Sequence, residues 1–118
     1  MTKFYKRIQV TGTANTEELK DLLTSTVEEP KKVIALWFTE YTGTLYHNAI
    51  LKAYIEREKI VDFPYSHFLI DSAADDRMVP PRLEIDAELP VGQTLSVGHT
   101  SGATASDFEI TVEYERTV

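Results

Sequence analysis

Hydrophobic and polar residues alternate over residues 107–115, and this pattern restricts the fold of the chain more than any other feature. Phe108, Ile110, Val112 and Tyr114 share one parity, and acidic or hydroxyl residues stand between them. Successive side chains of a β-strand point to opposite faces. The pattern therefore predicts a strand with one buried face and one face in water.

The same signals recur along the chain. Residues 82–89 alternate as cleanly, with every second side chain charged. Pro64 has no amide donor, so its segment is predicted to be an edge strand, a bulge or two short strands. Further strands are predicted at 4–11, 33–38, 45–57, 60–70 and 95–97, the last leading into a small-residue loop at 98–106. For 45–57 the alternation of Leu51, Ala53 and Ile55 favours a strand, but Ile50, Leu51, Tyr54 and Ile55 would also fit one face of a helix. About seven strands at turn spacing indicate an all-β fold, an antiparallel sandwich or barrel.

One short amphipathic helix is predicted near residues 16–28. Asn15 or Thr16 can cap its first turn, and Pro30 cannot continue it. Apolar residues follow at helical spacing. They are Leu19, Leu22, Leu23 and Val27.

Both parities are apolar between residues 33 and 38. This run predicts a strand covered on both faces, by the sheet partner on one side and by the helix or a neighbouring subunit on the other. Trp37 has apolar neighbours on both sides, which favours a core position over a ligand platform.

Length and composition define the class of protein. A chain of 118 residues without a Ser/Gly-rich linker is expected to form one domain, residues 1–118. No cysteine is present, which removes disulfides and thiol chemistry. The net charge of −7 disfavours nucleic acid as a partner. No apolar run approaches the roughly 20 residues of a membrane helix, and no signal peptide is recognisable at the start, so a soluble, cytoplasmic chain is expected, or a virion protein if it is viral.

The polar residues give little sign of a catalytic or metal site. Glu84, Asp86 and Glu88 project from one face of a predicted strand, as paired catalytic carboxylates would, but any water-facing sheet carries such residues. Ser101 is followed directly by glycine and lacks the strand-to-helix context of a nucleophile elbow. The histidines lie in separate segments and are expected at the surface or rim, and cation binding by the acidic loop stays open. These residues are His47, His67 and His99, and Asp71, Asp75 and Asp76.

Four tyrosines near turns and strand ends are the candidate ligand or interface residues. Their rings can stack on a sugar or on a partner protein, or they can close the ends of the core. They are Tyr41, Tyr46, Tyr54 and Tyr65.

The last third of the chain resembles a known family. The strand at 83–89, the turn at 90–92, the strand at 95–97 and the closing strand at 107–114 together resemble small single jelly-roll sandwiches of viral capsid and other virion proteins, over residues 80–116. The resemblance implies a jelly-roll-like β-sandwich that assembles into trimers, pentamers or a shell, with other virion proteins as further partners. The family has no shared catalytic residues. It often carries a basic arm for the genome, and here only Lys3, Lys6 and Arg7 are available.

Three functions follow, in order of support. The first is a non-enzymatic structural building block that forms homo-oligomers without a cofactor or metal. The second is a carbohydrate- or ligand-binding module that uses the tyrosines and the loops at 41–48 and 98–106. The third is an enzyme built on the carboxylates of strand 82–89.

Overall fold

The computed structural model describes residues 2–40, 49–65, 82–103, 105 and 107–117, which form eight β-strands and no α-helix. Within these ranges no helix is long and apolar enough to cross a membrane. The strands are β1 (Lys3–Val10), β2 (Glu17–Thr24), β3 (Lys31–Glu40), β4 (Ile50–Ile55), β5 (Glu58–Pro64), β6 (Arg82–Leu89), β7 (Thr94–Thr100) and β8 (Phe108–Arg116).

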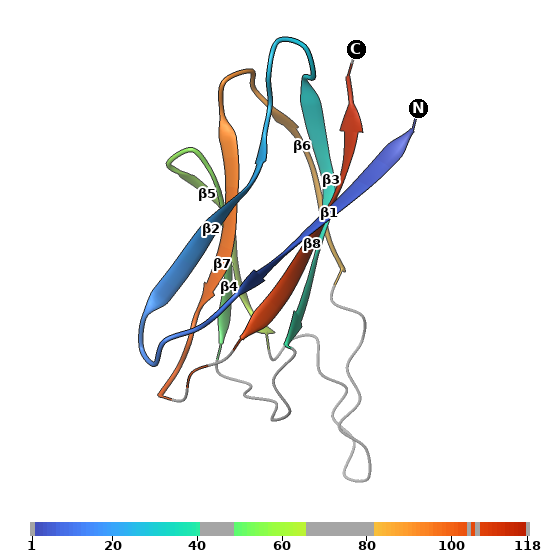
Figure 1. The fold of residues 1–118 in the computed structure, drawn as a ribbon. Helices are drawn as coiled ribbons and strands as arrows, with labels where there is room; N and C mark the ends of the chain where they lie inside the picture. Colours follow the sequence, from blue (N-terminus) through green and yellow to red (C-terminus); the bar gives the residue numbers. More distant parts are fainter. Residues whose placement is uncertain (1, 41–48, 66–81, 104, 106, 118) are drawn as a thin grey trace, which may run out of the picture.

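The strands form two four-stranded antiparallel sheets that face each other (Figure 1). One sheet has the order β1-β8-β3-β6, and the other has the order β2-β7-β4-β5. The fold is therefore all-β and sandwich-like, as the alternation predicted. The four edge strands are β1 and β6 in the first sheet and β2 and β5 in the second.

The hydrophobic core lies between the two sheets and takes residues from both. In β8 the inward parity is buried as predicted, with Phe108, Ile110 and Val112 fully covered. Burial of such side chains is the main favourable term in folding. The largest apolar side chains in the core are Tyr65, Phe38, Phe108, Leu36, Leu51, Leu95 and Ile110.

The predicted helix near residues 16–28 is wrong, because Glu17–Thr24 form strand β2. The pairing of β2 with β7 shifts between Asp21 and Leu23, so the intervening Leu22 interrupts the alternation and both leucines are buried. Two consecutive buried leucines after Leu19 imitate helical spacing. Leu19 itself is exposed and Val27 is 75% exposed, so no continuous apolar stripe exists.

Strand β3 lies inside its sheet, between β8 and β6. A register shift between Val33 and Ala35 makes Ile34 an extra residue opposite β8, which is the geometry of a β-bulge. After the bulge, Leu36 and Phe38 are fully buried in the core, and Trp37 pairs with Thr111 on the outer face. No helix covers that outer face in the described chain, so the helix expected as cover of β3 is wrong, and cover by a neighbouring subunit stays a prediction.

Other strand predictions are confirmed or corrected in their bounds. Strand β5 is an edge strand and ends at Pro64, which agrees with the missing amide of proline. Of the segment predicted at 45–57, residues 49–57 are described, and strand β4 takes Ile50–Ile55 of them, with a turn at 56–57. Strand β7 continues through Gly98 and His99 to Thr100, so the predicted loop at 98–106 begins later, at Ser101.

Candidate functional site

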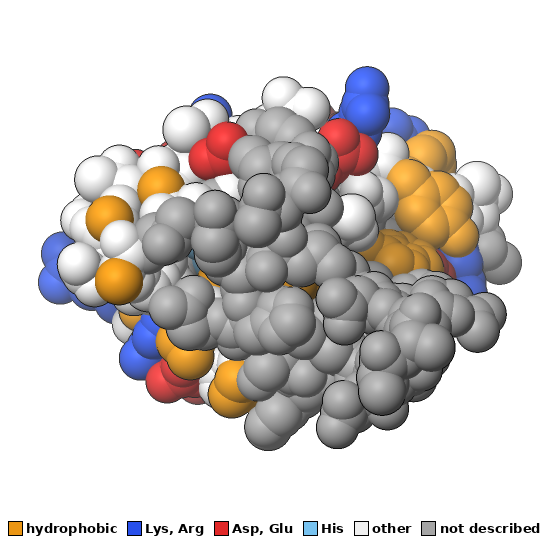
Figure 2. Space-filling model, turned by 90° about the horizontal axis from the view of Figure 1, so that it is seen from below, with side chains coloured by type: hydrophobic (Ala, Val, Ile, Leu, Met, Phe, Trp, Pro, Cys, Tyr) orange, Lys and Arg blue, Asp and Glu red, His pale blue; other side chains and the backbone are white. Residues whose placement is uncertain are grey.

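The outer face of the β1-β8-β3-β6 sheet carries a group of three side chains, Tyr5, Trp37 and Arg82, here called the Trp37 patch. The rings of Tyr5 and Trp37 are 6.0 Å apart, and the Arg82 guanidinium lies 5.2 Å from the centre of the Trp37 ring. Tyr5 is 61% exposed, whereas Trp37 and Arg82 are half-buried. Figure 2 shows hydrophobic and basic side chains together on the right, the side on which this sheet lies in Figure 1.

A buried carboxylate lies beside the patch. Glu113 of β8 is nearly inaccessible, although it belongs to the outer face, where it pairs with Tyr5 and Ala35. Its carboxylate is 3.1 Å from the Lys3 ammonium and 3.3 Å from the Arg82 guanidinium. Arg82 also forms an ion pair with Glu84. The guanidinium is therefore fixed between two carboxylates and one indole ring.

The two cations control the ionisation of Glu113. Burial raises the pKa of this carboxyl, but hydrogen bonds from Lys3 and Arg82 outweigh burial and hold the pKa below its ordinary value. The hydrogen bond to Glu113 in turn raises the pKa of Lys3. The cluster therefore stays charged near neutral pH.

Sequence reasoning missed the Trp37 patch. It assigned Trp37 to the core, because the neighbours of Trp37 along the chain are apolar. The patch is assembled from three distant segments by the strand order, so no spacing along the sequence reveals it. One signal in the sequence could have indicated the patch. Thr39 is polar and has the same parity as Trp37, which indicates that this parity faces outward, and Thr39 is exposed in the structure.

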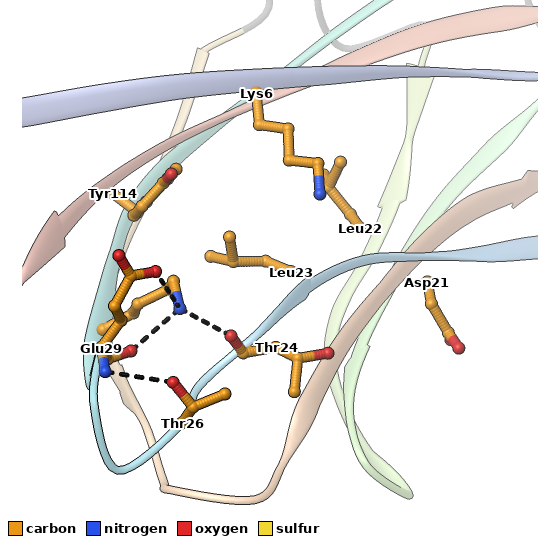
Figure 3. Close-up of a pocket in the computed structure, with 9 residues that line it drawn as sticks. Lys6, Asp21, Leu22, Leu23, Thr24, Thr26, Glu29 and Tyr114 are labelled. Carbon is orange, nitrogen blue, oxygen red and sulfur yellow. Dashed lines mark hydrogen bonds and ion pairs between the residues drawn. The ribbon is translucent and has the colours of Figure 1, made fainter.

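A cavity of about 420 Å³ lies where β1 and β2, the edge strands on one side, separate from each other (Figure 3). Leu22 and Leu23 supply its apolar wall, and the ring of Tyr114 lies on the opposite side. The side chain of Lys6 extends from β1 toward Leu22. The cavity thus combines an apolar wall with an ammonium group at its mouth.

A second lysine at this cavity holds the β2–β3 connection in place. The ammonium of Lys31 is buried and donates hydrogen bonds to the carbonyl oxygens of Thr24 (2.7 Å) and Glu29 (2.9 Å). It also lies 3.9 Å from the Glu29 carboxylate. These partners offset the cost of burying the charge, so Lys31 has a structural role here.

The four candidate tyrosines do not form one site in the described residues. Tyr54 lies half-buried on the outer face of the other sheet, where its hydroxyl donates to Glu17 at 3.2 Å. Tyr65 is fully buried and packs edge-on against Phe108, with ring centroids 4.7 Å apart. It therefore closes the end of the core. Tyr41 and Tyr46 lie outside the described residues.

His99 is buried, which corrects the expected surface or rim position. Its ring lies 4.6 Å from the ring of Phe108, in the same aromatic group as Tyr65. His47 and His67 lie outside the described residues. Ser101 is also buried, with its amide donating to the carbonyl of Thr16.

The carboxylates of β6 are all exposed to solvent. Asp86 pairs with Lys32 at 2.9 Å, and Glu84 pairs with Arg82. No group of three histidine or acidic side chains in the described chain is arranged to hold a metal ion. The acidic loop with Asp71, Asp75 and Asp76 lies outside the described residues.

Comparisons with known proteins identify no relative. A scan against models of protein families finds no match, and searches of curated proteins and of solved structures find none either.

Proposed function

We propose that this protein is a non-enzymatic structural building block of jelly-roll type that assembles with copies of itself, as a capsid or other virion protein does. The observation that carries the proposal is the Trp37 patch. Tyrosine, tryptophan and arginine are the residue types most enriched at the energetic centres of protein interfaces. On the outer face of a sheet these side chains do not serve the core of their own chain.

The strand pairing supports a jelly roll. Strands β1 and β8, β2 and β7, β3 and β6, and β4 and β5 are antiparallel partners. This is the pairing of one long hairpin, and the further pairs β3–β8 and β4–β7 roll that hairpin into two sheets. Eight strands in two such sheets are the arrangement of the jelly roll, which occurs in viral capsid proteins, lectins and cupins.

The rigidity of the patch supports an interface role. Arg82 is held by Glu113, Glu84 and the ring of Trp37, so little side-chain entropy is left to lose on association. The exposed ring of Tyr5 adds contact area at low entropic cost. An oligomer of three or five subunits agrees with the family that the sequence resembles.

Light scattering after size-exclusion chromatography tests the proposal. We expect the wild-type chain to form an oligomer whose dissociation constant rises about thirtyfold in Tyr5→Ser, the size of a typical interface hot spot. Val27→Ser, which truncates an exposed apolar side chain far from the patch, is the matched control and is expected to leave the mass unchanged. A wild-type chain that stays monomeric at high concentration overturns the proposal.

A ligand-binding module is the second candidate function, and the cavity between β1 and β2 is the observation that favours it. Its volume of about 420 Å³ is in the range of small-molecule sites, although it is open to solvent and more polar than such sites usually are. A carbohydrate ligand is tested on a glycan array with wild-type protein, Tyr41→Ala and Tyr46→Ala, and a cavity ligand by titrating wild-type protein and Leu22→Phe. Binding that these substitutions abolish favours the module, whereas absence of glycan and small-molecule binding removes it.

A further inference from the structure

We propose that copies of this chain associate edge to edge, with β1 of one copy beside β6 of the next. The β1-β8-β3-β6 sheets then continue from copy to copy through this contact, here called the joint. The inference rests on the proposed self-assembly and names the surfaces that make it. Three properties of these two edge strands support the inference: their charge, their direction and the order of their side chains.

The two edges of this sheet carry opposite charge. Strand β1 has three basic residues and no acid, whereas β6 has three acids and one base. The other sheet shows no such contrast, because β2 and β5 both contain more acids than bases. Of the four edge strands described, β1 alone is basic in a chain of net charge −7. A basic edge in an acidic protein favours an acidic partner edge.

The strand directions suit a continuous sheet. Neighbouring strands in the order β1-β8-β3-β6 are antiparallel, so β1 and β6 run in opposite directions. A second copy placed with β1 beside β6 in the same orientation therefore adds an antiparallel pair. Edge strands offer unpaired amide and carbonyl groups for such an extension.

Ile85 and Asp86 of β6 lie opposite the single Ile34 of β3, which is a bulge. When the free edge of β6 is counted residue by residue through this bulge, one antiparallel register matches both faces of the two edges. On the outer face it brings two of the three bases of β1 opposite acids of β6, whereas Lys6 has the inner parity and falls opposite Ile85. The outer pairs are Lys3 with Glu88, and Arg7 with Glu84. Lys3 and Arg7 are four positions apart in β1, and Glu84 and Glu88 are four positions apart in β6.

The same register matches the inner face. There it places half-buried apolar side chains of β1 opposite half-buried apolar side chains of β6. The inner pairs are Phe4 with Ala87, and Ile8 with Leu83. Opposite-charge and apolar cross-strand pairs both stabilise antiparallel sheets.

The charged groups are accessible for a partner. The side chain of Arg7 is 73% exposed, and that of Glu84 is 66% exposed. Arg7 now pairs with Glu109 and Glu84 with Arg82, so the joint exchanges these two ion pairs for pairs with the next copy, while Arg82 keeps Glu113 and the ring of Trp37. Near the end of β1 the ammonium of Lys20 binds the carbonyl of Gln9, so the joint is expected to end at Ile8.

The joint uses different surfaces on the two copies. Such a heterologous contact produces a ring if its rotation closes and a filament if it does not. A two-fold dimer is therefore not the expected product. A closed ring of copies, or a filament, is expected.

Charge reversal at one predicted pair tests the joint by sedimentation velocity. We expect Arg7→Glu and Glu84→Lys each to weaken assembly at least about tenfold, and the double variant to return to about the wild-type level. The single variants shift the net charge in opposite directions, and the double variant restores it. Glu88→Lys is a second variant that disturbs no ion pair formed between described residues, and circular dichroism checks that each variant is folded.

Arg57→Glu and Glu28→Lys are the matched controls, since they change the same charges on exposed connections outside β1 and β6. Both are expected to assemble as the wild type does. If the wild type assembles but neither Arg7→Glu nor Glu84→Lys weakens it, or the double variant does not recover, the joint is wrong while self-assembly stands. If the wild type remains a monomer throughout, self-assembly is wrong as well.

Cross-linking gives an independent measurement, because the natural chain has no cysteine. Under mild oxidation, the variant with Arg7→Cys and Glu84→Cys is expected to give disulfide-linked dimers, trimers and larger species. The variant with Arg57→Cys and Glu84→Cys is the control and is expected to stay mostly unlinked. Equal linkage in the two variants contradicts the joint.

Discussion

Gly98 of β7 lies against the backbone of Glu18 in β2, so closely that a Cβ added to the glycine would be 2.8 Å from the Glu18 carbonyl carbon. The same atom would be 2.9 Å from the Cα of Leu19. Glycine is therefore required at this position because β2 and β7 lie so close together. It is not required for a turn.

We predict that Gly98→Ala lowers the free energy of unfolding by about 1–3 kcal/mol, because β2 must move to admit the methyl group. Chemical denaturation measures the change. Gly92→Ala is the comparison, since its Cβ would meet nothing within 4 Å and only the φ of +87° opposes it. A smaller loss for Gly98→Ala than for Gly92→Ala would show that β2 and β7 are not this close.

Glu113 gives a prediction about pH. Its pKa is lower in the folded protein than its ordinary value of 4.5, so the carboxylate contributes stability above that value and loses it as the pH falls through the folded pKa. We predict that Glu113→Gln lowers the stability at pH 7 by about 1–3 kcal/mol, because Lys3 and Arg82 lose their charged acceptor.

The difference in stability between wild type and Glu113→Gln is expected to shrink as the pH falls below 4.5. Denaturation curves across the acidic range measure it. Glu109→Gln is the control, since the pair of Glu109 with Arg7 is solvent-exposed and is expected to contribute about 0–1 kcal/mol. A difference that does not change with pH contradicts the assigned role of Glu113.

Alternation predicted β6 and β8 closely, because each has one buried face and one polar face over its whole length. It failed wherever a bulge changes the parity within a strand. In β2 the shift at Leu22 buries two consecutive leucines, and in β3 the shift at Ile34 displaces the parity of Trp37. A bulge is one extra residue, and the order of residue types does not mark it.

The candidate site was harder to predict than the fold. Tyr5, Trp37 and Arg82 meet only through the order of strands in one sheet, which is a long-range property. Tyr54 and Tyr65 were grouped together because both lie near predicted turns, yet one lies on an outer face and the other in the core. Burial depends on which elements close over a side chain, and a local pattern does not determine it.

The two described tyrosines are predicted to respond differently to truncation. Tyr65→Ala removes a fully buried ring from its contact with Phe108 and is expected to cost about 3–5 kcal/mol. Tyr54→Ala loses an exposed hydrogen bond to Glu17 and is expected to cost less than about 1.5 kcal/mol. Thermal and chemical unfolding measure both, and similar losses would contradict the core position of Tyr65.

Asp86 tests the bulge in β6, where Ile85 and Asp86 lie opposite the single Ile34 of β3. The φ of 50° at Asp86 lies in the left-handed region, which glycine adopts without steric cost. We predict that Asp86→Gly is more stable than Asp86→Ala by about 1 kcal/mol, because both lose the pair with Lys32 and only alanine keeps the strain. Equal stabilities of the two variants in chemical denaturation would show that this backbone is not strained.

The most direct test of self-assembly is the molar mass of the wild-type chain by sedimentation equilibrium over a wide range of concentrations, with the emission of Trp37, the single tryptophan, recorded in parallel. We predict that the mass rises from that of a monomer to a multiple of it, and that the Trp37 emission shifts to the blue as the patch is covered. A monomer mass and unchanged emission at every concentration would contradict the proposed function.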